Sequence, residues 1–304
     1  MNEKSEDGAV DLRGALVSIG IPVRNGAGTL ERTIRSVLSQ EHEPLELVIS
    51  DNASTDATEE LCRDLAQGDS RIIYHRHDRN VGLLNNFVQV IQMSRGKFFR
   101  WLGDDDWLAP HYVSRCLEPF SHDPRLILVT SQIRYTNPDG SSFTRAYRPI
   151  ALTSDDPLAR LKEFLRLTDG MVLDPLYGLM RRRDVASIAR RNMIREDEVF
   201  AAKLALLGPW SHVPEVLAHR HLATAPLSAL TGRLDVPAWQ AYAATAVQCG
   251  ELLRVIGQSK LVPRQRWAAR GAVARMYVYR HYLDTARRIR RVRNMVSRAR
   301  GARV

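Results

Sequence analysis

The stretch Arg100-Trp101-Leu102-Gly103-Asp104-Asp105-Asp106-Trp107 places three consecutive carboxylates directly after an apolar run. Neighbouring like charges repel one another and lose hydration when a fold gathers them, so the triplet favours a bound cation. Oxygen ligands suit Mg²⁺ or Mn²⁺, which usually bridge one or two carboxylates to the phosphates of a substrate. Taken alone, the triplet is also typical of a solvated turn or a helix start, because Asp is a common N-cap residue.

The composition is that of an ordinary globular chain. Its 304 residues suffice for one large domain or a main domain with an appendage, and 44% hydrophobic and 26% charged residues are normal for a soluble fold. We expect neither a signal peptide nor a membrane span, because the first residues are polar and no run of about 18 apolar residues occurs. Cys62, Cys116 and Cys249 lack metal-ligand spacing and are expected to be reduced core residues of a cytoplasmic protein.

Strand and helix signals alternate through the first hundred residues. Apolar runs at 16–21, 45–50, 71–74 and 97–102 are typical of buried strands, and helical spacing of apolar residues follows each of the first three. This alternation predicts a parallel α/β sheet with helical crossovers. Ligands of such sheets bind outside the carboxyl ends of the strands, which is where the carboxylate triplet lies.

The loops at these strand ends carry charged and hydrogen-bonding side chains. They span residues 22–26, 51–56, 79–82 and 104–106. They contain no Gly-x-Gly-x-x-Gly and no Gly-x-x-x-x-Gly-Lys-Ser/Thr, which counts against a dinucleotide cofactor and a P-loop. Asp and Asn for a base and ribose, Arg for phosphate and carboxylates for a metal together predict a nucleoside diphosphate ligand.

Four segments, in order and with matching spacing, resemble family 2 glycosyltransferases, the inverting GT-A enzymes that use nucleotide-sugar donors. These segments are residues 17–25, 51–58, 80–87 and 96–106. The resemblance implies an α/β fold of the GT-A (Rossmann-like) type over residues 15–222, a mostly parallel sheet flanked by helices. A flexible N-terminus, residues 1–14, would precede this domain, and a basic helical C-terminal region, residues 223–304, would follow it as an appendage.

The resemblance also implies a donor site and a metal. The expected nucleotide-binding residues are Pro22, Arg24, Asn25, Asp51, Asn52, Arg79, Gly82 and Asp104, and the expected metal-binding residues are Asp105, Asp106 and His221. The usual Asp-x-Asp-Asp pattern of the family has glycine here in its first acidic place, at Gly103, so Asp105 becomes the best metal ligand. Asp104 is then a ribose or metal contact, and Asp106 a supporting or helix-capping group. The expected cofactor is Mn²⁺ or Mg²⁺.

Two further segments have alternative interpretations. In the segment that resembles the closing strand of the family, either His219 or His221 reaches the metal and Arg220 binds phosphate, or these are ordinary surface residues. Residues 181–183, three arginines, fit either an acceptor contact or a solvated helix start. Residues 135–149 predict an irregular hairpin or a flexible lid.

A second acidic triplet, Glu196-Asp197-Glu198, opens a predicted helix. Alone, it is typical of a helix N-terminus, where acidic side chains interact favourably with the dipole. It also resembles the Glu-Asp-x-x-Phe/Leu motif of the family, which implies that Asp197 is the general base, with Glu196 and Glu198 as substitutes. Displacement at an anomeric carbon needs such a carboxylate near the acceptor hydroxyl, while a metal neutralises the diphosphate leaving group.

The C-terminal region is helical and basic, and much of the net charge of +10 lies there. Trp239, Tyr242 and Trp267 are expected to pack its helices. Residues 287–298 space apolar side chains along one helical face among arginines, so this helix either lies on an anionic membrane surface or is a solubilised terminal helix. The basic segment contains no aromatic residue, which counts against nucleic acid as a partner.

These observations predict a metal-dependent inverting glycosyltransferase. Its donor would be a nucleoside diphosphate sugar, with UDP as the expected nucleotide, and its acceptor a hydroxyl of a saccharide, a lipid-linked compound or a small molecule. The alternatives are a sugar-nucleotide pyrophosphorylase, which would carry a Gly-rich loop with Arg and a Pro-Lys after the first strand, and a basic nucleic-acid-binding or scaffold protein. The expected location is the cytoplasm or the inner face of the cell membrane.

Overall fold

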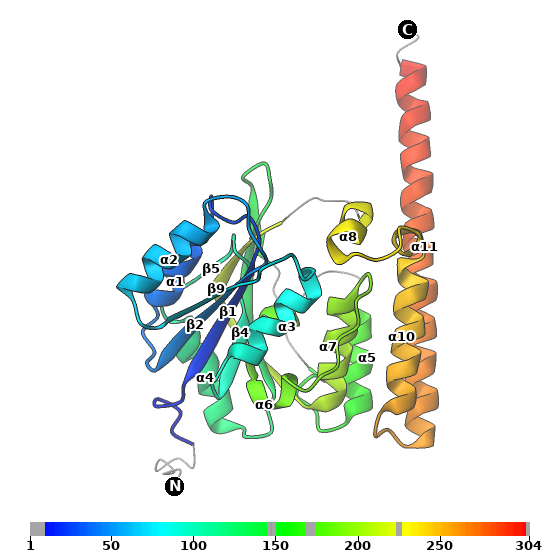
Figure 1. Ribbon diagram of the computed structural model, residues 1–304. Coiled ribbons are helices and arrows are strands. Elements are labelled where there is room, and N and C mark those ends of the chain that lie inside the picture. Colours follow the sequence, from blue (N-terminus) through cyan, green and yellow to red (C-terminus); the bar gives the residue numbers. More distant parts are fainter. Residues whose placement is uncertain (1–9, 145–146, 148–149, 168–173, 223–226, 302–304) are drawn as a thin grey trace.

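Among the described residues, nine strands form one curved sheet with helices on both faces (Figure 1). The structure, a computed structural model, describes residues 10–144, 147, 150–167, 174–222 and 227–301, and the side chains of the last helix up to Tyr282. Residues 1–9 of the predicted flexible N-terminus lie outside this range. The first half of the chain forms β1 (Val17–Val23), α1 (Leu30–Leu38), β2 (Leu45–Asp51), α2 (Thr58–Gly68), β3 (Ile72–Arg76), α3 (Leu83–Met93), β4 (Phe98–Trp101), β5 (Trp107–Leu108), α4 (Tyr112–His122), β6 (Leu128–Thr136) and β7 (Ser142–Thr144).

The second half of the chain adds the short strand β8, the long strand β9 and most of the helices. Its elements are α5 (Pro157–Leu167), the 3₁₀ turn η1 (Pro175–Tyr177), β8 (Leu179–Arg181), α6 (Arg182–Val185), α7 (Glu196–Leu207), β9 (Trp210–His221), α8 (Leu227–Leu234), α9 (Trp239–Tyr242), α10 (Ala244–Gln258) and α11 (Pro263–Gly301). Strand β8 is short, because Pro175, with its fixed φ, begins a 3₁₀ turn just before it.

The strand order is β3-β2-β1-β4-β8-β6-β9-β5, with β7 beside β6. Strands β3, β2, β1 and β4 are parallel, which confirms the predicted helical crossovers. Beyond β4 the sheet is mixed, because β8 runs antiparallel to both β4 and β6. The end of β6 and β7 form a hairpin that overlaps the predicted 135–149 segment, of which residues 145, 146, 148 and 149 lie outside the described range.

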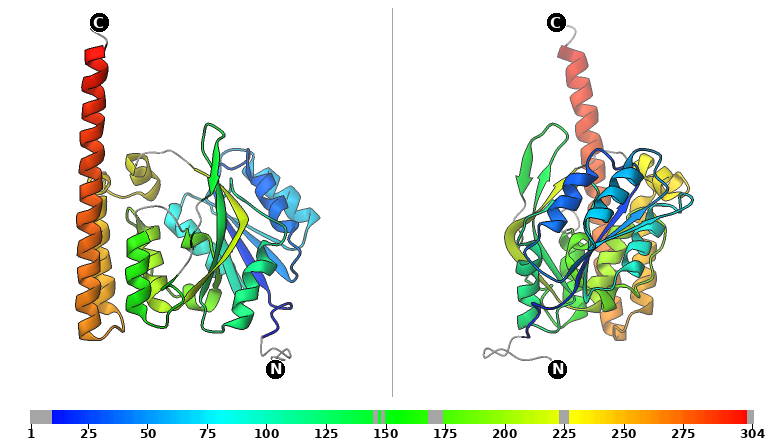
Figure 2. Two further views of the ribbon diagram at one scale, coloured as in Figure 1. Left: turned by 180° about the vertical axis from the view of Figure 1, so that it is seen from behind. Right: turned by 60° about the vertical axis from the view of Figure 1, so that its left-hand side comes forward.

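Each face of the sheet has its own hydrophobic core (Figures 1 and 2). Helices α1, α2 and α4 pack on one face, and the other core joins α3, α5 and α7 to the C-terminal helices α10 and α11. The strands β1 and β2 are buried along their whole length, as expected for strands covered on both faces. The three cysteines are buried and unpaired, as predicted.

The last helix, α11, runs along one side of the molecule and extends past the rest of the fold (Figure 2). Its buried stripe consists of small and flexible residues, Ala269, Ala272, Val273 and Met276, which allow close packing. The expectation that Trp239, Tyr242 and Trp267 pack these helices is wrong: all three are exposed, because the buried stripe turns Trp267 outward and the short α9 leaves the other two at the surface. The arginine-rich 287–298 lies within α11, but its side chains lie outside the described residues.

No helix in the described part of the chain combines the length and the apolar character needed to cross a membrane.

Arg280 ties α11 to the helix that carries the second acidic triplet. Its guanidinium forms an ion pair with Glu198 of α7 and donates to Oε1 of Gln248 on α10 at 2.7 Å. Gln248 in turn donates to Glu198 Oε2 at 3.0 Å. Three helices therefore meet at one partly buried carboxylate.

We expect Arg280→Met to lower the free energy of unfolding by roughly 2–3 kcal/mol, because Glu198 and Gln248 would lose their shared donor in a poorly hydrated site. Chemical denaturation of the full chain measures this. The matched control is Arg270→Met on the exposed side of α11, which should change stability by no more than about 0.5 kcal/mol. Equal losses in both variants would contradict the assignment.

Candidate active site

The first carboxylate triplet follows β4 and meets the end of β9. Asp105, Asp106 and His221 each offer a ligand atom, and these atoms lie within 4.8 Å of one another. The structure thus brings together the three predicted metal-binding residues. His219, the alternative to His221, instead stacks on the Trp107 ring with centroids 4.7 Å apart.

The hydrogen bonds of this cluster leave two metal-ligand atoms available. Nδ1 of His221 lies 2.8 Å from the backbone oxygen of Asp105, which can only accept, so Nδ1 carries the proton and Nε2 keeps its lone pair. The Asp105 carboxylate forms no hydrogen bond or ion pair with another residue in the described part of the chain. Both groups are therefore free to bind a cation.

Asp106 is the buried member of the triplet. Its Oδ2 accepts from Nε of Arg220 at 3.0 Å, and its Oδ1 accepts from the backbone N–H of His221 at 3.2 Å. Burial raises the pKa of Asp106 above its usual range, and Arg220 offsets this in part. Asp106 therefore supports the cluster from inside the protein, as well as offering it an oxygen.

Gly103, the departure from the family pattern, fits the space that is available. A Cβ at this position would lie 2.8 Å from Oδ2 of Asp106, the oxygen that Arg220 holds. It would also lie 3.2 Å from Oδ1 of Asp105. A side chain at residue 103 would therefore displace the carboxylates of this cluster.

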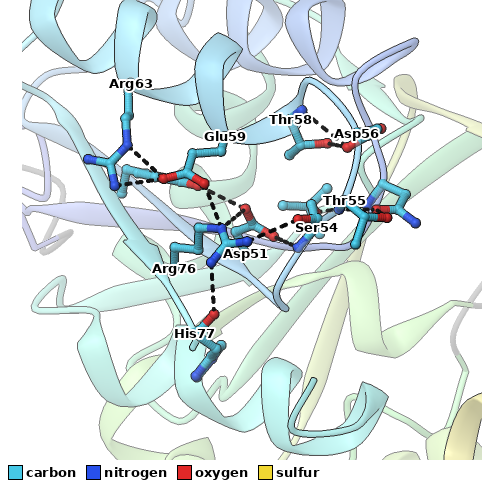
Figure 3. A network of polar contacts seen from close by, with 12 residues as sticks. Asp51, Ser54, Thr55, Asp56, Thr58, Glu59, Arg63, Arg76 and His77 are labelled. Carbon is cyan, nitrogen blue, oxygen red and sulfur yellow. Dashed lines mark hydrogen bonds and ion pairs between the residues drawn. The ribbon is translucent and has the colours of Figure 1, made fainter. Parts of the chain in front are cut away.

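The loop after β2 is fixed by its own acidic residues (Figure 3). Asp51 is fully buried and accepts from the backbone N–H of Ser54 and from the Tyr74 hydroxyl, both at 2.8 Å. Arg76 lies beside it, pairs with Glu59 at 2.8 Å and donates to the backbone oxygen of Ser54. Asp51, which was predicted to contact the nucleotide base, thus also stabilises the loop. Each of its carboxylate oxygens keeps a further lone pair.

Asn52 connects this loop with the next one along the sheet edge. Its amide donates to Oδ1 of Asn80 at 2.7 Å and accepts from the N–H of Val81 at 2.7 Å. Asn80 also accepts from the N–H of Gly82, whose φ of 89° only glycine adopts without strain. Asn80 opens one of the four segments that resemble the family but was not among the expected nucleotide-binding residues, and the side chain of Arg79 beside it is exposed.

The loop after β1 closes the same edge. Asn25 accepts from the N–H of Thr55 at 2.8 Å, while Arg24 is exposed and Pro22 is buried within β1. A Cβ on Gly26 would lie 2.8 Å from Oδ2 of Asp104, so this loop packs directly against the triplet. Burial, together with repulsion by Asp105, raises the pKa of Asp104 to about 6.

The three acids of the second triplet have different surroundings. Glu196 forms a buried ion pair with Arg190, and Glu198 is held by Arg280 and Gln248. Asp197 forms no ion pair with another described residue. It reaches solvent in a pocket of about 190 Å³ whose walls include Phe164, Tyr177 and Asp174.

The pocket walls lower the hydration of the Asp197 carboxylate, although the residue as a whole is exposed. This desolvation, with repulsion by Glu198, raises the pKa of Asp197 to about 6. A carboxylate with such a pKa is ionised at neutral pH and accepts a proton more readily than an ordinary aspartate does. Of the three acids, Asp197 is the one placed for acid–base chemistry.

Arg220 connects the cluster of predicted metal-binding residues with this pocket. Beside its bond to Asp106, its guanidinium forms an ion pair with Asp174 and lies 3.8 Å from the centre of the Tyr177 ring. Asp174 also accepts from the Tyr135 hydroxyl at 3.0 Å. Arg220, which was predicted to bind phosphate, therefore has a structural role in this protein. Asp174 is a site residue that no sequence motif indicated.

The cluster also borders a larger pocket of about 850 Å³. The first turns of α1, including Arg32 and Arg35, form one wall, and Thr136 and Pro138 of the β6–β7 hairpin form another. Asp105 and His221 line it as well. The two metal-ligand atoms thus lie beside a space large enough for a small-molecule ligand.

Residues 181–183, for which the sequence left an acceptor contact or a helix start open, lie at the start of α6. Arg181 pairs with Phe98 at the first residue of β4, at the opposite edge of the sheet from Asp104. It donates to the backbone oxygen of Leu126 at 2.7 Å, and α6 begins at the next residue. The alternative, a helix start, is what the structure shows.

A model of the family described as "Glycosyl transferase family 2" matches residues 18–188, more than half of the chain. The chain belongs to this family and is a glycosyltransferase by class. It is 33% identical over 132 residues to a chondroitin synthase of Pasteurella multocida (strain Pm70). That match covers 43% of this chain but only 14% of the synthase.

Solved structures share the fold. The structure of S. aureus TarS in complex with UDP-GlcNAc matches with a TM-score of 0.62 and 13% identity, over 86% of this chain and 72% of that one. The mannosyltransferase PcManGT from Pyrobaculum calidifontis, in complex with GDP-Man and Mn²⁺, matches with a TM-score of 0.55 and 14% identity, over 86% and 74%. These similarities confirm the predicted GT-A fold.

We expect Asp104→Asn to raise the free energy of unfolding of the metal-free protein at pH 7 by roughly 1–2 kcal/mol. The carboxyl of Asp104 has a pKa of about 6 in the native state and about 3.9 in the unfolded chain. Its ionisation therefore destabilises the native state fully above pH 6, and this cost disappears as the pH falls towards about 4.

Urea denaturation at several pH values measures this difference. The advantage of the variant should shrink steadily between pH 7 and about pH 4. Asp64→Asn, at an exposed position of α2, is the control and should show no such trend. An advantage that does not depend on pH would contradict the desolvation of Asp104.

Proposed function

We propose that this chain is a metal-dependent, inverting glycosyltransferase that moves a sugar from a nucleoside diphosphate sugar to an acceptor hydroxyl. One observation supports this most strongly: Arg220 joins a cation-binding type of cluster to a pocket that holds an unpaired carboxylate with a raised pKa. Stabilising the leaving group needs a cation site, and deprotonating the acceptor needs a carboxylate base. The two must lie close together without being paired with each other.

The donor set of the cluster fits Mn²⁺ or Mg²⁺. Asp105 and His221 supply a free carboxylate and a free Nε2, and Asp106 supplies a third, supported oxygen. Carboxylates suit both ions, and the imidazole favours the transition ion Mn²⁺. The structure of PcManGT with GDP-Man and Mn²⁺ supports this choice. When bound, the ion would neutralise the charge that develops on the diphosphate leaving group.

The residues of the chain divide the remaining work. Asp51, Asn52 and Asp104 lie on the loops that would hold the base and ribose, with UDP as the first candidate nucleotide, as in the TarS complex. Asp197 would accept the proton of the acceptor hydroxyl as its oxygen attacks the anomeric carbon. Attack on the face opposite the departing diphosphate inverts the configuration of that carbon.

The acceptor and the location are proposed more broadly. The similarity to a chondroitin synthase supports a saccharide hydroxyl as the acceptor, with lipid-linked or small-molecule hydroxyls as the other classes. We propose the cytoplasm as the location of the reaction, with nucleotide sugars as its donors. Neither the pyrophosphorylase nor the nucleic-acid-binding alternative has an observation in its favour.

We expect one of UDP and GDP to bind in isothermal titration, and to bind more tightly when Mn²⁺ is present. Asp105→Ala should remove most of this metal dependence, because Asp105 carries the unpaired carboxylate of the cluster. Asp64→Ala, an exposed acid of α2, is the matched control and should bind as the wild type does. Nucleotide affinity that changes neither with the metal nor with the Asp105 substitution would contradict the proposed metal site.

Asp197→Asn is expected to lower kcat by roughly 10²–10⁴-fold while the donor still binds. Hydrolysis of UDP-GlcNAc and GDP-mannose, with water as the acceptor, provides the assay. In the wild type, kcat should rise as the pH passes about 6, because the base must be ionised. If a folded Glu198→Gln variant loses turnover and Asp197→Asn does not, the role belongs to Glu198 instead.

A further inference from the structure

A groove of about 600 Å³ lies between α5 and α11. Its lining residues are Lys162, Leu165 and Arg166 from α5 and Ala272, Arg275, Met276 and Tyr279 from α11. We propose that this groove and the adjoining exposed face of α11 dock the protein on an anionic lipid bilayer, with lipid phosphate bound at Lys162, Arg166 and Arg275.

The charges of the groove are unbalanced. Lys162, Arg166 and Arg275 are exposed, and none forms an ion pair or hydrogen bond with any other residue that the structure describes. No acidic residue is among the groove's described lining. Surface arginines elsewhere do have such partners, for example Arg35 with Glu31 at 2.6 Å. Three unpaired cations around one groove form a site for a phosphate group.

The groove also combines an apolar floor with exposed aromatic residues. Leu165 and Met276 are buried beneath the cations. Tyr279 at the rim is 49% exposed, and Tyr282, one turn further along α11, is 68% exposed. Val278 beside them is 67% exposed. Tyrosines next to apolar side chains and cations are typical of surfaces that sit at the headgroup level of a membrane.

The overall charge of this region favours a lipid surface over a second copy of the chain. Residues 263–304 contain thirteen arginines and one aspartate, a net charge of +12, whereas the whole chain carries +10. The remainder of the protein is therefore slightly acidic. Two copies facing each other through α11 would repel, while anionic headgroups attract basic residues by about 1 kcal/mol for each Lys or Arg near the surface.

Docking at this groove would place the catalytic pocket near the bilayer. Helix α5 presents Lys162 and Arg166 to the groove, whereas its Phe164 and Leu167 line the pocket of Asp197. One helix therefore separates the proposed lipid contact from the proposed base. This inference does not depend on the transferase reaction, since it concerns a different surface and a different ligand.

Co-sedimentation of the full chain with vesicles tests the proposal. Vesicles of phosphatidylcholine with about 30% phosphatidylglycerol should bind the protein, and pure phosphatidylcholine vesicles should not. The triple variant Lys162→Gln, Arg166→Gln, Arg275→Gln should lower the partition coefficient at least about tenfold. The matched control, Arg13→Gln, Arg35→Gln, Arg63→Gln, removes the same charge from exposed positions outside α5 and α11 and should have a smaller effect. Tyr279→Ser should weaken binding at constant charge.

Several results would overturn the proposal. Equal losses in the two triple variants would mean that only net charge matters, and unchanged binding in the first would move the attachment to other cations, such as those of 287–298. Sedimentation analysis showing a dimer that Tyr279→Ser dissociates would make the face an interface between copies. Circular dichroism of each variant confirms that the exposed substitutions leave the fold intact.

Discussion

The guanidinium of Arg220 lies between two carboxylates, and the candidate site depends on this interaction. Asp106 and Asp174 come from segments far apart in the chain, and without a cation between them their charges would repel. Arg suits this position because it stays ionised even when buried and donates in several directions. At the end of β9, Arg220 pairs with Asp106 and Asp174, and the next residue, His221, offers a ligand atom beside Asp105 and Asp106.

The acids of this protein are distinguished by their partners more than by their positions in the sequence. Glu196 and Glu198 have arginine partners that fix their helix, and Asp51 accepts hydrogen bonds from Ser54 of its own loop and from Tyr74 of β3. Asp105 and Asp197 have no such partner among the described residues, and these two groups border pockets. The fold thus neutralises the carboxylates that it uses for structure and leaves available those suited to a cation and to a proton.

The C-terminal helices support the site from behind. Residues of α10 and α11 share one hydrophobic core with α5 and α7, the helices that shape the pocket of Asp197. Arg280 and Gln248 then meet Glu198, the residue next to the proposed base. Because close packing transmits displacement, a shift of α11 would also displace the start of α7. The region predicted as an appendage is in this sense part of the frame around the pocket.

The sequence by itself determined the first four strands with their helical crossovers, the order of their loops and both acidic triplets, because these depend on local periodicity and on turn-forming residues. It contained no motif for Asp174, it indicated the segment 80–87 but not the role of Asn80, and it left open whether His219 or His221 reaches the cluster, because partners far apart in the chain decide these roles. Trp267 was misplaced for the same reason: a helical pattern shows which residues are apolar, but only the neighbouring helices decide which face is buried. The separation of binding carboxylates from structural ones was likewise set by tertiary structure, since it depends on where arginines from other elements come to lie.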